Sequence, residues 1–533
     1  MKQFVALCLV VFGFAMGFAQ KEFHVFPVDH KTTPGKATGN GSLSKPWDLQ
    51  TALSQNNSVV NGGAIIWLHK GVYNGRYIST ISSSNNKKIT VSPYGKDEVV
   101  LNGNLPSKLG VVLEVKGGNV IFKNFTITFL GNFSRLQTEA NFQKVDGISH
   151  VDGENCEFIN LTIHNVPGSG IGSWKRTGST KIEGCTIYNN GFMSKARGSG
   201  VGIYVQNESE QTRLISNNII FNNYYKGIEV WSATSGIGKQ FVKNVLLENN
   251  VLFNNGAPVG KHWSNVIIAS DDKEGVNVAK NITFRNNILY HNADFYNKSN
   301  FGDGNSLTIG YNAKALVEEV VVENNIIIGH NNALNLLYAK SLTFKNNTVY
   351  TGYVHFNAPV LQNYGNYKFS GNNYFSRKQQ AFRVLKHQDY QLKDWSNKFN
   401  LDAGSSWKQV KDFTLHNVLD ISKIEGAENS YKAVLFEKDG KSVAVNFSDK
   451  DVEAGTTYKV VDVENPEVVL KEGKLNAERI IEIPMQNTAF VKPLHNNQTV
   501  KTVSNFGVYK IDFSTPEKKQ KASFFGRLFG WLF

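Results

Sequence analysis

Short apolar segments recur along the chain, and most of them follow a pair of polar residues, often Asn-Asn. The pattern occurs at residues 123–127 (KNFTI) and 159–163 (INLTI), and it returns after Asn217-Asn218. The first positions of the repeats are 124, 160, 184, 217, 249, 286, 324, 346 and 372, so their spacing varies from 22 to 38 residues. The apolar segments are short, β-branched and alternating, which predicts strands rather than helices.

A variable spacing with a minimum of 22 residues predicts a coil of short strands that carries insertions in its turns. One such coil cannot bury its own apolar face, whereas stacked coils share a continuous core. Asparagine tolerates a left-handed backbone, and its amide can bond to the same amide in the next coil. We therefore interpret the Asn pairs as structural ladders of an all-β solenoid, and not as catalytic residues.

The segments before the repeats resemble the first coils of right-handed parallel β-helix proteins, the superfamily of pectate lyases and related polysaccharide enzymes. Residues 39–47 (GNGSLSKPW) and the amphipathic residues 49–53 (LQTAL) look like the capping-helix entry of those enzymes. Residues 65–73 and 89–95 resemble their first coils. The resemblance covers residues 22–400 and implies a right-handed parallel β-helix solenoid. The resemblance is only weak evidence for the substrate, because one fold hosts many activities.

After residue 420 the short repeats end, and longer segments with alternating apolar and polar residues follow. Residues 431–447, 457–463, 467–469 and 480–483 predict antiparallel strands, with a hairpin turn at Asp439-Gly440. We therefore expect a β-helix with an N-terminal cap over residues 20–415, followed by a small antiparallel β-sandwich over residues 420–513.

The two ends of the chain differ from the rest. In residues 1–19, Lys2 precedes an apolar run and small residues, which is typical of a secretory signal peptide and too short for a membrane span. This predicts a secreted, periplasmic or cell-surface protein. Residues 514–533 combine three lysines with an aromatic stretch. Such a tail fits contact with a membrane surface or a partner, or packing on its own domain.

The 533 residues include 57 Lys+Arg and 44 Asp+Glu, a net charge of +13, and only 19% are charged. This composition indicates a folded chain with an acidic partner, and charge alone leaves nucleic acid, membrane and acidic polysaccharide open. A secreted β-helix has little reason to bind nucleic acid, so we expect the acidic partner to be a polysaccharide. We also expect the protein to be a monomer. Cys156 and Cys185 are interpreted as buried apolar residues without a disulfide.

Three successive coils align on a Gly-apolar start at Gly170, Gly200 and Gly227. In this alignment Ile171, Val201 and Ile228 point inward, and the aromatic residues that follow point outward. We expect these rings to form one exposed ladder that stacks against sugars: Trp174, Tyr204 and Trp231.

Polar residues cluster beside this predicted ladder. Cleavage of a uronate polymer by β-elimination needs a group that neutralises the carboxylate, a base for the C5 proton and an acid for the leaving oxygen. Lys226, Arg176 and Lys175 can supply positive charge, Lys226 or Tyr204 the base, and Tyr225 or Tyr204 the acid. Glu229, Gln206 and His262 complete the expected substrate-binding set, and Lys195 and Arg197 lie in an insertion between coils.

The leading hypothesis is a polysaccharide lyase, and two alternatives stay open. A glycoside hydrolase would use Glu229 with Asp271 or Asp272, and a non-catalytic surface protein would bind a glycan without cutting it. Asp271 and Asp272 are also the only weak indication of a Ca²⁺ site. The sequence contains no phosphate loop, zinc spacing or nucleophile-elbow motif, so no cofactor is assigned with certainty.

Overall fold

The computed structural model describes residues 20–296, 302–427 and 429–514. The predicted signal peptide, and the tail beyond Ser514, lie outside these residues. The chain divides into two compact units at Phe413, and residues 492–500 return to the first unit. We call residues 20–413 with 492–500 the β-helix unit, and residues 414–491 with 501–514 the C-terminal unit. Residues 492–500, which the sequence predicts to belong to the C-terminal β-sandwich, are part of the β-helix unit.

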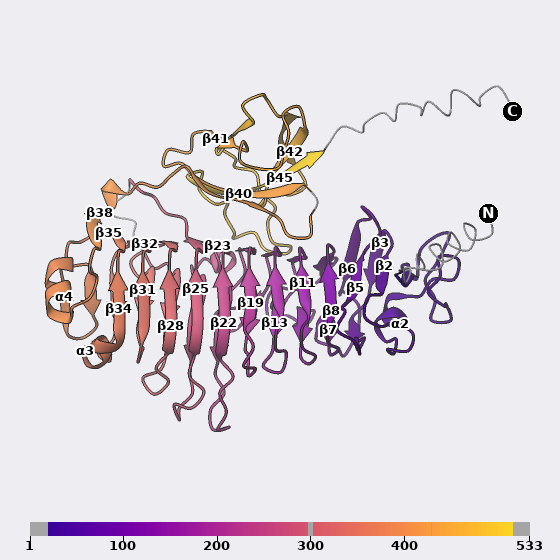
Figure 1. Cartoon of the computed structure of the whole chain (residues 1–533), viewed down its shortest axis with the longest axis horizontal. Coiled ribbons are helices and arrows are strands. Elements are labelled where there is room, and N and C mark those ends of the chain that lie inside the picture. Colours follow the sequence, from indigo (N-terminus) through magenta and orange to yellow (C-terminus); the bar gives the residue numbers. More distant parts are fainter. Residues whose placement is uncertain (1–19, 297–301, 428, 515–533) are drawn as a thin grey trace, which may run out of the picture. The chain divides into compact units, whose positions relative to one another are not determined.

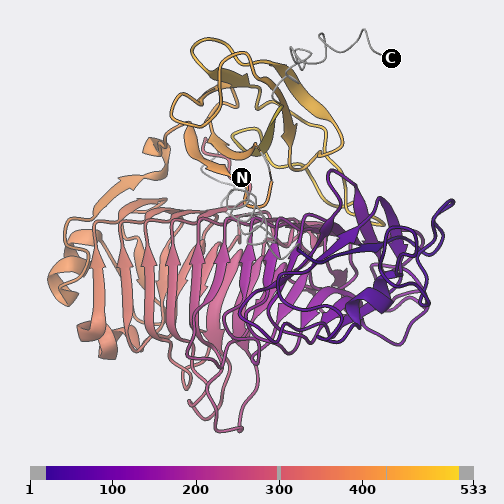
Figure 2. The same cartoon turned by 45° about the vertical axis from the view of Figure 1, so that its right-hand side comes forward.

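The β-helix unit consists of three stacked sheets of twelve strands each (Figures 1 and 2). Successive strands along the chain pass from one sheet to the next, so that each coil adds one strand to every sheet. Sheet 1 contains, in spatial order, β1 (Glu22–Val25), β2 (Ile65–Leu68), β5 (Ile89–Pro93), β8 (Val120–Lys123), β11 (Glu157–Ile159), β14 (Lys181–Glu183), β19 (Arg213–Ser216), β22 (Lys243–Glu248), β25 (Lys280–Arg285), β28 (Glu318–Glu323), β31 (Leu342–Lys345) and β34 (Tyr367–Ser370).

Sheet 2 carries the candidate site. It contains β4 (Tyr77–Ser79), β7 (Val111–Val115), β10 (Asp146–His150), β13 (Ile171–Ser173), β18 (Ile203–Val205), β21 (Ile228–Ser232), β24 (Val266–Ser270), β27 (Leu307–Ile309), β30 (Leu334–Leu336), β33 (Val354–Phe356), β36 (Phe382–Val384) and β37 (Gln388–Tyr390). All neighbours in this sheet pair in parallel except β36 and β37, which are antiparallel and close its end.

Sheet 3 completes each coil. It contains β3 (Gly71–Asn74), β6 (Val99–Asn102), β9 (Thr126–Thr128), β12 (Thr162–His164), β15 (Thr186–Tyr188), β20 (Ile219–Phe221), β23 (Val251–Phe253), β26 (Ile288–Tyr290), β29 (Ile326–Ile328), β32 (Thr348–Thr351), β35 (Asn373–Ser376) and β38 (Ser406–Gln409). The predicted parallel β-helix is therefore confirmed by three parallel sheets.

The few helices lie at the ends of the solenoid and in its turns. They are α2 (Leu49–Leu53), η1 (Ala257–Val259), α3 (Val360–Asn363), η2 (Tyr364–Asn366), α4 (Leu392–Phe399) and η3 (Val410–Asp412). Helix α2 is the predicted N-terminal helix; Asp48 caps it by accepting a hydrogen bond from the Thr51 N–H. No helix in the described ranges is long and apolar enough to cross a membrane.

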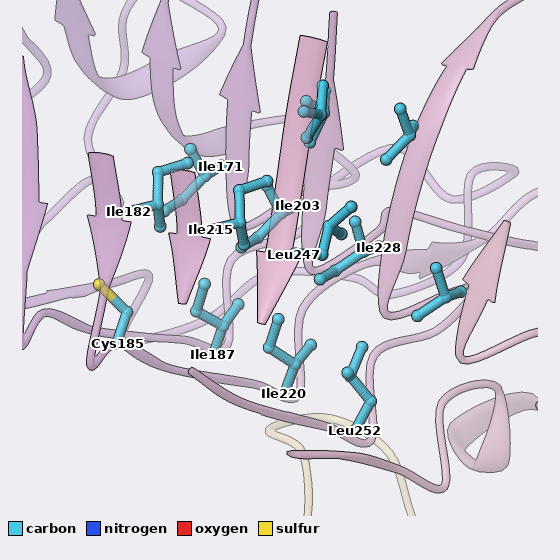
Figure 3. Close-up of a cluster of buried hydrophobic side chains, with 14 of the residues drawn as sticks. Ile171, Ile182, Cys185, Ile187, Ile203, Ile215, Ile220, Ile228, Leu247 and Leu252 are labelled. Carbon is cyan, nitrogen blue, oxygen red and sulfur yellow. The ribbon is translucent and has the colours of Figure 1, made fainter. Parts of the chain in front are cut away.

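Rows of aliphatic side chains, one from each coil, fill the interior of the β-helix (Figure 3). Ile171, Ile203 and Ile228 are register neighbours in sheet 2 and are fully buried. Adjacent coils lie about 4.8 Å apart, so each row is a continuous line of methyl groups along the helix. Cys156 and Cys185 are both free and buried in this core, as the sequence analysis predicts.

The Asn pairs form the predicted ladder, and the two positions of each pair have different tasks. The first Asn has a left-handed backbone, with φ near +58° at Asn217 and +55° at Asn286. The second Asn is buried, and its Nδ2 donates to the Oδ1 of the next coil, 2.9 Å away between Asn250 and Asn287. The ladder runs through Asn218, Asn250, Asn287, Asn325, Asn347 and Asn372.

Two details of the ladder were not predicted. The last unit begins at Gly371, which has a positive φ, and Asn372 is therefore the second and not the first position. A second ladder joins Asn190, Asn223, Asn255 and Asn265 at the following corner.

The C-terminal unit contains antiparallel strands, as expected. Its five-stranded sheet has the order β39 (Val418–Lys423), β40 (Ser430–Phe436), β45 (Phe506–Ser514), β42 (Thr457–Asp462) and β43 (Val469–Lys474), and a two-stranded sheet pairs β41 (Val443–Asn446) with β44 (Ile480–Ile483). The predicted hairpin at Asp439-Gly440 is wrong. The turn forms, but strands β40 and β41 on its two sides belong to different sheets.

Candidate functional site

The predicted aromatic ladder is wrong in register. In sheet 2, Ile203 and not Val201 lies beside Ile171 and Ile228, so the middle coil is displaced by two residues from the predicted alignment. Because two residues preserve strand alternation, Tyr204 still points outward. It lies in a row with Gly172 and Glu229, one row away from Trp174 and Trp231. The Trp174 and Tyr204 rings nevertheless contact each other, with centroids 5.2 Å apart.

A cavity of about 410 Å³ opens on the outward face of sheet 2, where β18, β21 and β24 meet. It contains five of the predicted site residues: Tyr204, Tyr225, Lys226, Glu229 and Trp231. The remaining lining residues, which the sequence analysis did not assign to the site, are Lys144, Ser169, Phe192, Arg197, Ser199, Gly200, Val201, Ile267 and Tyr311. We call this cavity the candidate site.

Lys226 and Glu229 form an ion pair inside the candidate site. The Lys226 Nζ lies 2.6 Å from Glu229 Oε1, and both side chains are almost completely buried. Lys226 occupies the turn before β21, and Glu229 is the first outward residue of that strand. Because the Lys226 Nζ donates this bond to Glu229, the geometry favours the predicted role of Lys226 as a cation over its predicted role as a base.

Two cations lie close to the Tyr225 ring. The Lys226 Nζ is 3.8 Å from its centroid, and the Arg197 guanidinium is 3.9 Å from it. Arg197 comes from a hairpin inserted between two coils, in which β16 (Phe192–Met193) pairs with β17 (Gly198–Ser199). Gly191 has a positive φ of 116°, and a Cβ there would meet the Ser199 carbonyl oxygen at 2.3 Å. Glycine therefore lets the hairpin leave the coil at this point.

Tyr204 has the arrangement of a proton donor. The Gln206 Nε2 donates to its hydroxyl oxygen at 3.0 Å, so the hydroxyl proton is free to point to another acceptor. Burial, and then the negative charge of Glu229, raises the pKa of Tyr204 to about 12. The phenol therefore keeps its proton near neutral pH, which opposes the predicted alternative role as a base. Gln206 supports Tyr204 from outside the cavity lining.

The other predicted catalytic and substrate-binding residues lie outside the candidate site. Lys175 lies over the Phe241 ring at 4.7 Å, and Arg176 approaches Asp152 to 3.5 Å. The Trp174 Nε1 donates to Ser149 Oγ, which folds the ring back over Gly172. Strand alternation correctly gave the outward side of the sheet, but it could not show in which direction the turn after Ser173 continues.

His262 also lies outside the candidate site, in a cluster of imidazoles. Its ring centroid is 4.9 Å from that of His291 and 5.4 Å from that of His330. Burial, and then the positive charge of His330, lowers the pKa of His262 to about 4. The ring is therefore neutral near pH 7 and does not contribute charge to substrate binding.

The carboxylates of Asp271 and Asp272, the residues of the weakly predicted Ca²⁺ site, have partners within the protein. Asp272 accepts hydrogen bonds from the Ser235 hydroxyl and from the backbone N–H groups of Glu274, Val276 and Asn277. Burial by itself raises the pKa of Asp272, but these donors together outweigh it and hold the pKa at about 2, and they occupy oxygens that a cation would need. Asp271 pairs with Lys273 and accepts from Asn312. Across the described ranges, no group of three or more His, Cys, Asp or Glu residues is arranged to hold a metal ion.

The balance of charge in the candidate site favours an anionic ligand. Lys144, Arg197 and Lys226 contribute three positive charges, and Glu229 is the single acid among the residues that line the cavity. Aromatic rings form part of the remaining lining, and Trp231 and Tyr311 pack edge to face with centroids 5.0 Å apart. Rings beside cations and hydroxyl groups suit a sugar that carries a carboxylate, because a sugar has apolar faces as well as polar edges.

No protein-family model matches the sequence, and no curated protein matches it. Solved structures with similar folds include the pectate lyase Pel9A, with 15% identity over 77% of this chain and 84% of that chain and a TM-score of 0.43. A rhamnogalacturonan lyase has 14% identity over 70% and 86%, with a TM-score of 0.44. PfbA, a surface adhesin of Streptococcus pneumoniae, has 12% identity over 66% and 90%, with a TM-score of 0.42.

Proposed function

We propose that this protein is a secreted polysaccharide lyase that cleaves a uronate-containing polysaccharide by β-elimination at the candidate site. The observation that carries the proposal is a single cavity with three cations, three tyrosines and one ion-paired carboxylate. The predicted signal peptide supports an extracellular location, where such polymers occur.

The roles follow from the geometry of the side chains. Lys226 and Arg197 neutralise the uronate carboxylate, which stabilises the negative charge that develops when the C5 proton leaves. Tyr225, after giving up its phenol proton to water, accepts the C5 proton as a phenolate and becomes a neutral phenol; the two cations beside its ring favour the negative charge that it carries before the transfer. The electrons form the C4–C5 double bond as the C4–O bond breaks, and Tyr204 donates its proton to the leaving oxygen.

The glycoside hydrolase alternative receives less support from the same cavity. Hydrolysis at most glycosidase sites uses two carboxyl groups that flank the bond. Glu229 is the one carboxylate among the lining residues, and it is paired with Lys226. Asp271 and Asp272 do not line the cavity, and their oxygens have the other partners described above. Binding without cleavage would use the same cations and rings, so only a search for product separates it from the lyase.

The test is incubation of the purified full chain with a panel of uronate polymers that differ in sugar and linkage. Ultraviolet absorbance of unsaturated uronates and the number of new reducing ends are followed together. We expect both signals to rise in proportion on at least one polymer. New reducing ends without the absorbance would favour hydrolysis, and a polymer that binds tightly without either signal would favour a binding protein.

A further inference from the structure

A second cavity of about 500 Å³ lies on the other side of the β16–β17 hairpin from the candidate site. Its walls come from the turn at residues 132–141, from Met193 of the hairpin, from Tyr224, from Pro258 and Val259, and from the segment 495–498 that returns to the β-helix unit. The same two chain segments, the β16–β17 hairpin and Tyr224-Tyr225, contribute to both cavities. Phe192 and Tyr225 line the candidate site, whereas their neighbours Met193 and Tyr224 line the second cavity.

Backbone hydrogen bonds hold the β16–β17 hairpin against the turn at residues 132–141. Met193 donates to the Arg135 carbonyl oxygen at 2.7 Å and accepts from the Gln137 N–H at 2.9 Å. The segment from the C-terminal part of the chain is tied to the same place, because the Asn496 Nδ2 donates to the Tyr224 hydroxyl oxygen at 2.8 Å. The second cavity is therefore built from several chain segments that these bonds hold together, and is not a gap beside one loop.

Arg135 is the one lysine or arginine among the residues that line the second cavity, and its N–H groups are directed to protein oxygens. Arg135 is buried at the base of the cavity, and its five N–H groups donate to oxygens of Leu494, Val166, Gly191, Asn165 and Asn189. The acid Glu139 accepts from the Ser134 hydroxyl. The charged side chains Arg135 and Glu139 are thus engaged within the protein, and three cations line the candidate site against one here.

Side-chain amides provide the polar surface of the second cavity. Asn132, Asn141, Asn497 and Gln498 are exposed, and their amide groups have no hydrogen bond to any residue that the structure describes. Each amide offers both donors and an acceptor. A sugar hydroxyl also donates and accepts, so neutral amides match neutral sugars where cations match a carboxylate.

We propose that the second cavity binds a neutral sugar. Two sites that share the hairpin and the Tyr224-Tyr225 pair can contact one glycan chain. If the candidate site holds a uronate, as in the proposed function on which this step rests, then the substrate is a polysaccharide in which neutral sugars accompany the uronates as neighbours or branches.

The experiment measures binding of neutral disaccharides and trisaccharides of hexoses, pentoses and deoxyhexoses to the full chain, by calorimetry and by ligand-observed NMR. We expect at least one to bind, and the double variant Asn141→Ala/Gln498→Ala to bind it at least tenfold more weakly. Asn57→Ala, which removes an exposed amide far along the sequence in the N-terminal coils, is the matched control and should bind normally.

Absence of binding by every neutral sugar would overturn the proposal. Equal affinity of the double variant and the Asn57→Ala control would also overturn it. Both results are independent of the lyase assay, because they use no uronate and measure no cleavage. Failure of the lyase proposal would instead be recorded as missing unsaturated product while the neutral sugar still binds.

Discussion

The Nζ of Lys226 lies 2.6 Å from Oε1 of Glu229, and the same Nζ lies 3.8 Å from the centre of the Tyr225 ring. The carboxylate thus holds the ammonium in a nearly buried position against the ring of the tyrosine that we propose as the base. A buried charge is stabilised when it is paired and hydrogen-bonded. Glu229 is therefore a positioning residue for Lys226 in the proposed reaction.

Replacement of Lys226 by Gln removes the charge that neutralises the uronate. We expect kcat/KM for unsaturated product to fall by about 100-fold or more, because electrostatic stabilisation of the developing charge is lost. Lys175→Gln is the matched control, since Lys175 lies over Phe241 outside the candidate site. The double variant Lys226→Gln/Glu229→Gln, which leaves no unpaired carboxylate, should be equally inactive. Activity in that folded double variant would refute the assigned role.

Tyr204→Phe tests the proton donor. We expect kcat to fall by about 10²–10⁴-fold with little change in KM, which is the usual contribution of a positioned acid. Tyr364→Phe removes the hydroxyl of a half-exposed tyrosine outside the candidate site and should behave as wild type. The steady-state rate is followed by the absorbance of the unsaturated product. A Tyr204→Phe protein with unchanged kcat would show that another group protonates the leaving oxygen.

Most of the fold could be predicted from the sequence, because the β-helix repeats one local pattern many times. The Asn units at 217, 249 and 286 specify a left-handed corner followed by an amide ladder, and both appear in the structure. The second ladder was missed since its Asn pairs follow Tyr188, Phe221 and Phe253 and were not counted as separate units.

The candidate site was predictable only in part. Strand alternation placed Tyr204 and Glu229 outward, but the two-residue slip at Gly200 depends on the inserted hairpin, which pairs with itself and not with a coil. Lys144 and Arg197 reach the cavity from insertions whose path is set by long-range contacts. No local pattern encodes such a path, so their contribution required the structure.

The interior Asn ladder should contribute measurably to stability. Asn250→Ala removes bonds to the Asn218 N–H, the Asn218 amide, the Ile215 carbonyl and the Asn287 amide, all in the buried interior. We expect the free energy of unfolding of the β-helix unit to fall by about 3 kcal/mol, because buried partners are left unsatisfied. Urea unfolding, with Asn57→Ala as the surface control, measures the difference. Equal stability of the two variants would contradict the ladder's role.

Acid should destabilise the β-helix through His150. Burial, and then the charge of Arg213, lowers the pKa of His150 to about 3 from the model-peptide value of 6.5. The unfolded chain therefore binds the proton first, and stability is lost as pH falls from 6.5 toward 3. Between pH 6.5 and pH 4 this amounts to about 3 kcal/mol.

The matched variant for this prediction is His150→Gln, which can still donate to the Gly153 carbonyl oxygen. The free energy of unfolding is measured by urea titration at several pH values for both proteins. We expect the wild-type curve to fall more steeply with acid than the variant's. Parallel curves would contradict a neutral buried imidazole at this position.

The central claim is cleavage by elimination at the candidate site, and mass spectrometry of the oligosaccharides released from a uronate polymer tests it most directly. The account predicts products whose new non-reducing ends are one water lighter than hydrolysis products, and it predicts their disappearance in Lys226→Gln/Glu229→Gln. Products of full hydrolytic mass, or no cleavage of any acidic polysaccharide, would contradict it.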